Sequence, residues 1–224
     1  GVGRRPRGLA AARAPKNGSR RTNANALGKY FASAAHLEAA SVHAFRILRR
    51  ELAECGAPDD LLAAAKRAEA DEVRHTKLTA TIARTHGAKP APVRVRKRGA
   101  RSLEAIALEN AVEGCVRETF GALVAMYQAE HAVDHDIAAA LQEIAVDETR
   151  HAALAWSVAA WANTQLDAEA RKRIEAAKNQ AIRDLENELT VEAHPDLVAR
   201  AGVPTARAQK QLLRALQAEL RAGV

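Results

Sequence analysis

Two Glu-x-x-His motifs are the residues of this sequence with the clearest chemistry. The first is Glu72 with His75, and the second is Glu148 with His151. Residues three apart on a helix are neighbours on one face, so each motif can direct a carboxylate and an imidazole at the same point. A carboxylate and an imidazole together suit iron or manganese. The two motifs therefore predict metal ligation from helices.

Both motifs belong to a duplicated segment. Residues 59–75, DDLLAAAKRAEADEVRH, align without a gap to residues 135–151, HDIAAALQEIAVDETRH, with seven identities. Upstream, the eight residues that begin at Glu38 align with the eight that begin at Glu113, and both stretches end in Phe. Each copy thus offers one upstream Glu followed by Glu-x-x-His, which predicts a helical hairpin that occurs twice.

Four ionised carboxylates from the two copies would together carry enough negative charge to neutralise two divalent cations. Without metal, burial of these charges would lower the stability of the folded protein. The chain has two cysteines, Cys55 and Cys115, and no C-x-x-C pair, which argues against a structural zinc site or an iron–sulfur cluster. The alternative interpretation is a bundle in which these charges form salt bridges only.

These residues resemble the ferritin-like di-iron carboxylate superfamily, which includes bacterioferritin, rubrerythrin and the oxygen-activating oxidases and oxygenases, over about residues 25–163. The resemblance implies two iron ions, with manganese as the alternative metal, bridged by Glu72 and Glu148. The sequence lacks a rubredoxin-type C-x-x-C module, which excludes a rubrerythrin with its own electron donor. The six ligands that the resemblance implies are Glu38, Glu72, His75, Glu113, Glu148 and His151.

Each copy also ends in an Asp-Glu-x-Arg-His box. In the oxygen-activating branch the Asp of the box accepts a hydrogen bond from the ligand His of the opposite helix, and the Arg pairs with the Asp. The resemblance therefore implies that Asp71 serves His151. By the same relation, Asp147 serves His75. The residues with this supporting role are Asp71, Arg74, Asp147 and Arg150.

Other ionisable side chains lie near the ligand positions along the predicted helices. They are His36, His43, Glu109 and Glu118. Glu109 is four residues before Glu113 and shares its face on an α-helix. We expect Glu109 to be solvated or ion-paired instead of a metal ligand.

The composition predicts an all-α fold, because the apolar residues are mostly Ala and Leu and aromatic residues make up only 3% of the chain. Glycine, proline and acidic residues delimit helices over about residues 25–55, 59–87, 102–130, 134–163 and 167–189, and a short helix after Pro204. The three connections between the first four of these helices are short, long and short in turn, which is typical of a four-helix bundle with one crossover. We expect a ferritin-like four-helix bundle of two duplicated hairpins with one long crossover over residues 24–190, followed by a C-terminal extension with a short helix over residues 191–224.

The net charge of +7 is concentrated at the N-terminus, where residues 1–29 contain eight Lys and Arg and no acid. This composition predicts a disordered basic arm over residues 1–23, and residues 89–101 form a second basic cluster in a loop. Contact with a polyanion is one role that this charge would allow, and the arm is expected to be dispensable for metal binding. No segment is apolar enough for a transmembrane helix. We expect a soluble protein, either cytoplasmic or exported after loss of an N-terminal signal.

The predicted function is that of a dinuclear iron carboxylate protein that reacts with oxygen or peroxide, as an oxidase or oxygenase that uses an external electron donor. A homodimer is one assembly considered. One alternative is a ferroxidase or iron-storage protein whose substrate is Fe²⁺. The other is a metal-bearing interaction protein without enzymatic activity.

Overall fold

The computed structural model describes residues 4–10, 24–96 and 99–222, and most of these residues are helical. The only extended pairing in the described ranges is a single antiparallel β-bridge between Leu9 and Val95. The helices are α1 (Ala26–Glu54), α2 (Asp59–Thr85), α3 (Leu103–Glu109), η1 (Asn110–Glu118), α4 (Thr119–His131), α5 (His135–Gln165), α6 (Ala168–Glu188), α7 (Pro195–Ala201) and α8 (Ala206–Ala222). The predicted all-α class is confirmed.

The helix starts follow the capping residues of the sequence. The side chains of Asn25, Ser102, Asp134 and Asp167 each accept a hydrogen bond from a backbone N–H in the first turn of the helix that follows. Such caps satisfy N–H groups that have no partner inside the helix. At the end of α1 the chain turns through Gly56, whose positive φ of 72° is accessible to glycine without strain.

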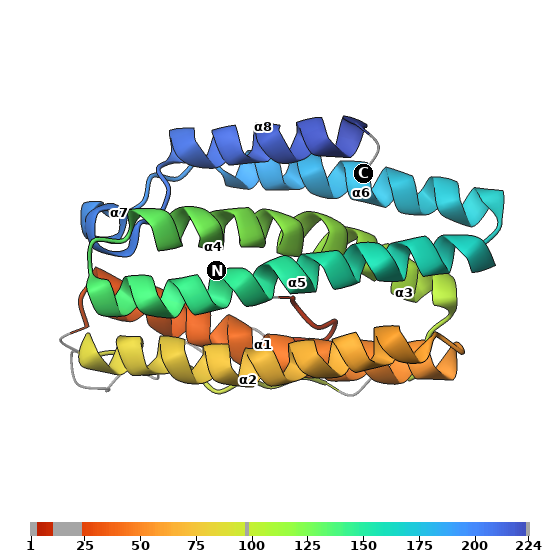
Figure 1. Cartoon of the computed structure of the whole chain (residues 1–224), viewed down its shortest axis with the longest axis horizontal. Helices are drawn as coiled ribbons and strands as arrows, with labels where there is room; N and C mark the ends of the chain where they lie inside the picture. The colour runs from red at the N-terminus through yellow and green to blue at the C-terminus, as the bar shows by residue number, and fades with distance from the viewer. Residues whose placement is uncertain (1–3, 11–23, 97–98, 223–224) are drawn as a thin grey trace.

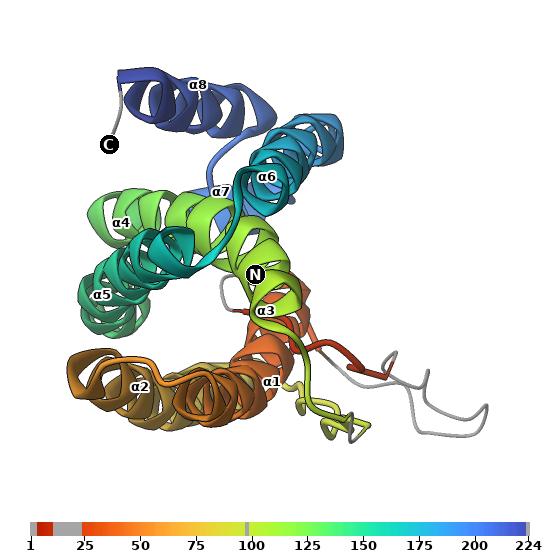
Figure 2. The same ribbon diagram turned by 90° about the vertical axis from the view of Figure 1, so that its right-hand side faces the viewer.

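The helices form layered pairs. Helix α1 packs along α2, α4 packs along α5, and α2 also contacts α5. In Figure 1 these two hairpins lie one above the other, and Figure 2 shows α6 and α8 on the far side of the α4–α5 hairpin. The interior has two apolar ends, one around Phe45 and Leu154 and the other around Phe31 and Ile137. A polar layer lies between these ends.

The third long helix is not a uniform α-helix. Helices α3, η1 and α4 run without a break from residue 103 to residue 131, but η1 is π-helical. At its end the Thr119 N–H donates to the carbonyl oxygen of Gly114, five residues earlier. A π-helix contains an additional residue in each turn, so it rotates the side chains away from their α-helical positions. No feature of the sequence predicted this π-helical segment.

Residues 4–10 have a defined position, although the sequence predicted disorder over residues 1–23. The carbonyl oxygen of Arg4 accepts a hydrogen bond from Ser41 Oγ of α1 at 3.0 Å, and Arg4 Nη2 donates to Asn110 Oδ1 of η1 at 3.1 Å. The segment thus lies between α1 and η1. Residues 11–23, which make up most of the predicted arm, lie outside the described residues.

The C-terminal extension contributes to the core. Leu213 and Leu216 of α8 are buried against Val116 and Phe120 of the third long helix, and Leu185 of α6 joins the same cluster. Helix α7, which was not expected from the sequence, precedes α8. None of the described helices is long and apolar enough to cross a membrane.

The first prediction concerns Gly28, where α1 passes close to the chain that leaves α2. A Cβ atom at Gly28 would lie 2.3 Å from the carbonyl oxygen of His86. Replacing glycine by alanine ordinarily favours a helix, but here the added methyl group meets backbone. We expect Gly28→Ala to lower the free energy of unfolding by about 1–3 kcal/mol, as measured by urea denaturation.

The control is Gly99→Ala, because an added Cβ there meets no described atom within 4 Å. A Gly28→Ala protein as stable as the control would contradict the close approach of α1 to the end of α2.

Candidate metal centre

A polar layer at the middle of the bundle gathers side chains from three helices. Glu38 comes from α1, Glu72 and His75 come from α2, and Glu148 and His151 come from α5. All five are at most 2% exposed. The apolar ends of the bundle shield this layer on both sides, so water does not solvate its charges.

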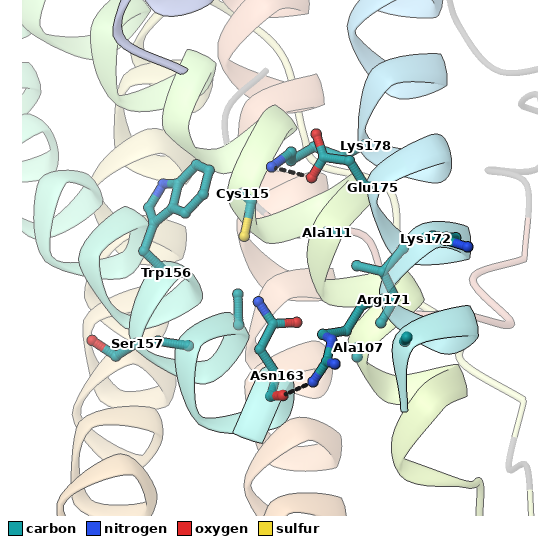
Figure 3. A pocket seen from close by; sticks show the side chains of 14 residues that line it. Ala107, Ala111, Cys115, Trp156, Ser157, Asn163, Arg171, Lys172, Glu175 and Lys178 are labelled. Atoms are coloured by element: carbon teal, nitrogen blue, oxygen red, sulfur yellow. Dashed lines mark hydrogen bonds and ion pairs between the residues drawn. The ribbon is translucent and has the colours of Figure 1, made fainter. Parts of the chain in front are cut away.

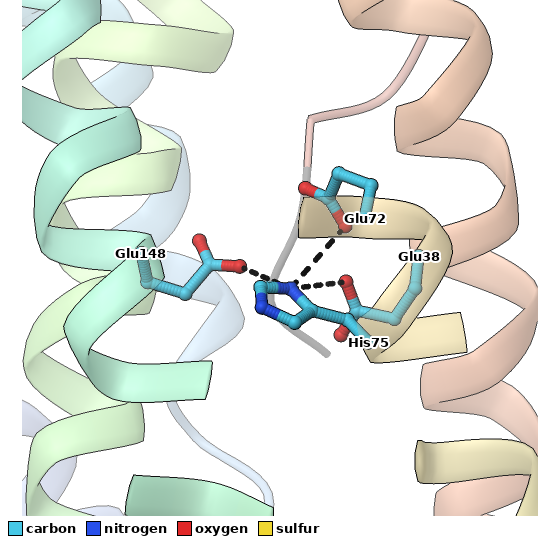
Figure 4. Close-up of side chains that lie close together, drawn as sticks. All are labelled: Glu38, Glu72, His75 and Glu148. Atoms are coloured by element: carbon cyan, nitrogen blue, oxygen red, sulfur yellow. Dashed lines mark ion pairs between the residues drawn. The ribbon is translucent and has the colours of Figure 1, made fainter. Parts of the chain in front are cut away.

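The imidazole of His75 faces three carboxylates (Figure 4). Its Nδ1 lies 3.6 Å from Glu72 Oε2, 3.6 Å from Glu148 Oε1 and 4.0 Å from Glu38 Oε2. One ligand atom from each of these four residues lies within 4.8 Å of the others. This spacing suits a metal ion placed among the four.

The imidazole of His151 faces the same central carboxylates. Its Nδ1 lies 3.6 Å from Glu72 Oε1 and 3.8 Å from Glu148 Oε1. Glu72 and Glu148 therefore lie between the two imidazoles, whose ring centroids are 5.9 Å apart.

Two hydrogen bonds between α2 and α5 fix the imidazole rings. His75 Nε2 lies 2.9 Å from Asp147 Oδ2, and His151 Nε2 lies 3.3 Å from Asp71 Oδ2. The two pairings expected from the resemblance are thus present. With each Nε2–H donating to an aspartate, each Nδ1 is directed at the central carboxylates.

Two arginines surround these aspartates. Arg74 Nη2 lies 2.9 Å from Asp71 Oδ1 and 2.5 Å from Asp147 Oδ2. Arg150 also contacts Asp71 and Asp147. Burial opposes ionisation of Asp71, but the hydrogen bonds from His151 and Arg74 lower its pKa to about 2. Asp71 therefore remains an acceptor for the His151 N–H.

The atoms that face the centre of the layer have no hydrogen-bond partner among the described residues. They are Glu38 Oε2, His75 Nδ1, His151 Nδ1 and both carboxylate oxygens of Glu72 and Glu148. Buried polar atoms are almost always hydrogen-bonded in proteins, so a group of unpartnered ones that point together calls for a ligand. Carboxylate oxygens and imidazole nitrogens are the donor atoms that iron and manganese accept. The residues fit a metal.

Burial and repulsion control protonation of the metal-free cluster. Burial raises the pKa of Glu38 to about 7, and the charge of Glu148 acts in the same direction. Burial, with the charges of Glu38 and Glu148, raises the pKa of Glu72 well above its ordinary value. Burial alone would lower the pKa of His151, but its hydrogen bond to Asp71 and the nearby charge of Glu148 raise it to about 10. Without metal, protons supply the positive charge that the carboxylates need.

The structure does not bring Glu113 into the cluster, although the resemblance implied that it is a ligand. Its side chain is 17% exposed, lies 3.9 Å from Arg117 Nε and accepts a hydrogen bond from the backbone N–H of Arg5 at 3.2 Å. The alignment that matched Glu113 to Glu38 assumes that both upstream helices wind alike, but Glu38 lies on an α-helix and Glu113 on the π-helix η1, so their side chains do not take equivalent positions.

Glu118 is instead the acid of this helix that lies at the polar layer. It is 1% exposed, and both of its carboxylate oxygens lack a hydrogen-bond partner in the described parts of the chain. Burial raises its pKa to about 7, while the charge of Arg4 and then that of His151 oppose the rise. The sequence placed Glu118 near the ligand positions, but only the π-helix identifies it. No pattern in the sequence predicted Arg4 here.

The other nearby side chains have roles outside the cluster. Glu109 is ion-paired, as expected, because Arg101 Nη1 lies 2.5 Å from its Oε2. His36 Nδ1 lies 2.9 Å from the carbonyl oxygen of Ala91. His43 lines a cavity beside α1.

A separate groove of about 820 Å³ lies beside η1, between α5 and α6 (Figure 3). Its walls include Cys115, Trp156 and Lys178, and Lys178 Nζ lies 5.4 Å from the Trp156 ring centroid. Burial raises the pKa of the Cys115 thiol to about 12. None of the cluster residues lines this groove.

Comparisons of this chain with protein-family models, with curated proteins and with solved structures found no match.

The second prediction concerns the pH dependence of the metal-free protein. A carboxyl group whose pKa is raised on folding binds a proton that the unfolded chain has already released. Its contribution to stability is complete below its ordinary pKa of 4.5 and is lost as pH rises through about 7, as for Glu38 and Glu118. We expect the melting temperature of the metal-free protein to fall between about pH 5 and pH 7.5.

Glu38→Gln should reduce this fall, because glutamine does not titrate. Glu130→Gln, an exposed change of the same kind, should leave the slope unaltered. Calorimetry in the presence of a chelator measures both. A melting temperature that stays level over this range, or equal slopes for the two variants, would contradict the buried cluster.

Proposed function

We propose that this chain is a ferritin-like metalloprotein whose buried cluster binds iron or manganese and supports oxidation by oxygen or peroxide, with electrons from an external donor. Two observations support the architecture. The α1–α2 hairpin and the hairpin of residues 103–165 correspond to the duplicated segments of the sequence. Each contributes Glu-x-x-His to the same polar layer.

The observation that carries the proposal is the convergence of unpartnered ligand atoms. Nδ1 of both imidazoles and the oxygens of Glu72 and Glu148 point at one another in a site closed to water. A structural salt-bridge network would satisfy these atoms with arginine or lysine. The nearby arginines Arg74 and Arg150 instead contact Asp71 and Asp147, outside the carboxylate group.

The ligand set favours redox-active metals. Imidazole and carboxylate without thiolate suit iron and manganese, and the two cysteines of the chain lie outside the cluster. Glu38, Glu72, His75 and Glu148 would hold one ion. Glu72, Glu148 and His151 would hold a second, with the charge of Glu118 close enough to influence it.

The chain's own residues prepare the centre for such a metal. Asp147 and Asp71 accept the Nε2–H of the imidazoles, which leaves Nδ1 free and makes it a stronger ligand. In the metal-free protein His151 holds an additional proton, so binding of a cation must release it. Bound iron or manganese would supply a redox couple for the reduction of oxygen or peroxide. The surrounding apolar side chains exclude bulk water from it.

The third prediction tests metal binding. The wild-type protein, stripped of metal, should bind at least one Mn²⁺ per chain with an increase in melting temperature, because a ligand that binds only the folded state stabilises it. Glu72→Gln should lower the Mn²⁺ affinity by roughly tenfold or more, since it removes a charge that faces both imidazoles. Elemental analysis and calorimetry provide the measurements.

Glu130→Gln is the matched control and should bind Mn²⁺ as the wild type does, because its side chain lies on the surface. Equal Mn²⁺ binding by wild type, control and Glu72→Gln would show that the cluster is not a metal site.

The fourth prediction tests the reaction. Protein loaded with Fe²⁺ under anaerobic conditions should consume oxygen repeatedly when ascorbate is present as the electron donor, while its iron content stays near the number of ions first bound. Glu72→Gln should lose this consumption. Uptake of many iron ions per chain without sustained consumption would contradict an oxidase and identify an iron-storage protein.

A further inference from the structure

Arg4 places a guanidinium group inside the bundle, beside the acid of the third long helix. The residue is 1% exposed. Its Nη1 lies 3.5 Å from Glu118 Oε2, and its Nη2 donates to Asn110 Oδ1 at 3.1 Å. Burial of a charged arginine is unusual unless the surrounding groups need its charge.

The π-helix η1 forms the cradle for this guanidinium. Asn110, Gly114 and Glu118 are all buried in it and are spaced four residues apart, close to one π-helical turn. A Cβ atom at Gly114 would lie 3.2 Å from Arg4 Nη1 and 2.8 Å from Asn110 Oδ1. The guanidinium therefore lies across Gly114, between Asn110 and Glu118.

The chain that carries Arg4 is attached at several points. Ser41 Oγ of α1 donates to the Arg4 carbonyl oxygen. Farther along, the Ala10 N–H donates to the Arg94 carbonyl oxygen at 2.9 Å and the Arg96 N–H donates to the Gly8 carbonyl oxygen at 3.1 Å. These backbone bonds hold residues 4–10 against the crossover loop, so the guanidinium stays in place without an ideal salt bridge.

Arg4 compensates the charge of Glu118 from a distance and does not form a bidentate hydrogen-bonded pair with it. Arginine and a carboxylate commonly form two parallel hydrogen bonds at 2.7–2.9 Å. Here the closest approach is 3.5 Å, and Arg4 Nε, Arg4 Nη1 and both Glu118 oxygens have no hydrogen-bond partner in the described ranges. Glu118 thus keeps its lone pairs free while its charge is compensated.

We propose that Arg4 acts as a built-in cation beside Glu118 and thereby limits the binding of a second metal ion next to His151. The inference rests on the proposed function, because it assumes that Glu72 and Glu148 bind metal. Arg4 and a second divalent ion would both neutralise Glu118, and their positive charges repel each other. The wild-type protein then holds one ion at the Glu38 side of the cluster, and the second binds strongly only when Arg4 withdraws.

The fifth prediction uses Arg4→Gln, which removes the charge and keeps a side chain of similar polarity. The affinity for a second Mn²⁺ should rise by roughly tenfold or more, because a buried like charge no longer opposes it. Elemental analysis should show about one tightly bound Mn²⁺ per wild-type chain and about two in the variant. Electron paramagnetic resonance should change from the spectrum of isolated Mn²⁺ to that of a magnetically coupled pair.

Arg7→Gln is the matched control, because it removes the same charge from an exposed position of the same segment. It should bind Mn²⁺ as the wild type does. Adding Glu118→Gln to Arg4→Gln should return the count to about one, since the second ion then lacks its carboxylate. A second Mn²⁺ affinity in Arg4→Gln equal to or below that of the wild type would overturn the proposal.

The wild-type protein provides an independent measurement if Arg4→Gln does not fold. Excess Mn²⁺ that fills the second position must displace the guanidinium, so amide hydrogen exchange in residues 4–10 should accelerate after the first equivalent. Unchanged exchange with two ions bound would overturn the proposal. Failure of the wild type to bind any Mn²⁺ would instead refute the proposed function, so the two failures are distinct.

Discussion

The burial of several carboxylates beside two imidazoles is the constraint on which the rest of this structure depends. Glu38, Glu72 and Glu148 approach one another in an interior where water cannot solvate them, so their ionised forms need a nearby positive charge. Protons, a bound metal ion or an arginine can supply that charge. The apolar clusters on both sides of the layer provide the hydrophobic stabilisation that allows the bundle to contain such a site.

The hydrogen bonds that orient the imidazoles also join the two hairpins. His75 of α2 bonds to Asp147 of α5, and His151 of α5 bonds to Asp71 of α2. Because each bond crosses between hairpins, the relative position of α2 and α5 determines where each Nδ1 points. The geometry of the centre and the packing of the bundle are therefore maintained by the same contacts, and a change in either would alter the other.

The two halves of the cluster are not equivalent, although they derive from a duplicated sequence. The half near His75 receives its additional acid, Glu38, from a regular α-helix. The half near His151 feels the charge of Glu118, which comes from a π-helix and already has Arg4 beside it. Two similar hairpins thus form a cluster whose two halves differ. Among the described residues, the half near His75 has no arginine or lysine against its carboxylates, whereas the other half has the Arg4 guanidinium beside Glu118. Under the proposal made for Arg4, this difference would let the N-terminal segment influence how many metal ions the centre holds.

The sequence by itself determined the helical class, most of the helix boundaries and the central part of the site. In each Glu-x-x-His motif the Glu and the His lie three residues apart on a regular helix, so local geometry alone predicts that they share a face. These pairs are Glu72 with His75 and Glu148 with His151. Glu118 and Arg4 required the tertiary structure. The alignment of the duplicated segments and the resemblance selected Glu113, whereas the π-helical winding of η1, which packs against α5 and α6, brings Glu118 to the polar layer. Arg4 and Asn110 are 106 residues apart, and the composition of the N-terminal segment predicts only disorder. Its position is decided by a buried acid that needs a positive charge, and that need exists only once the helices have assembled.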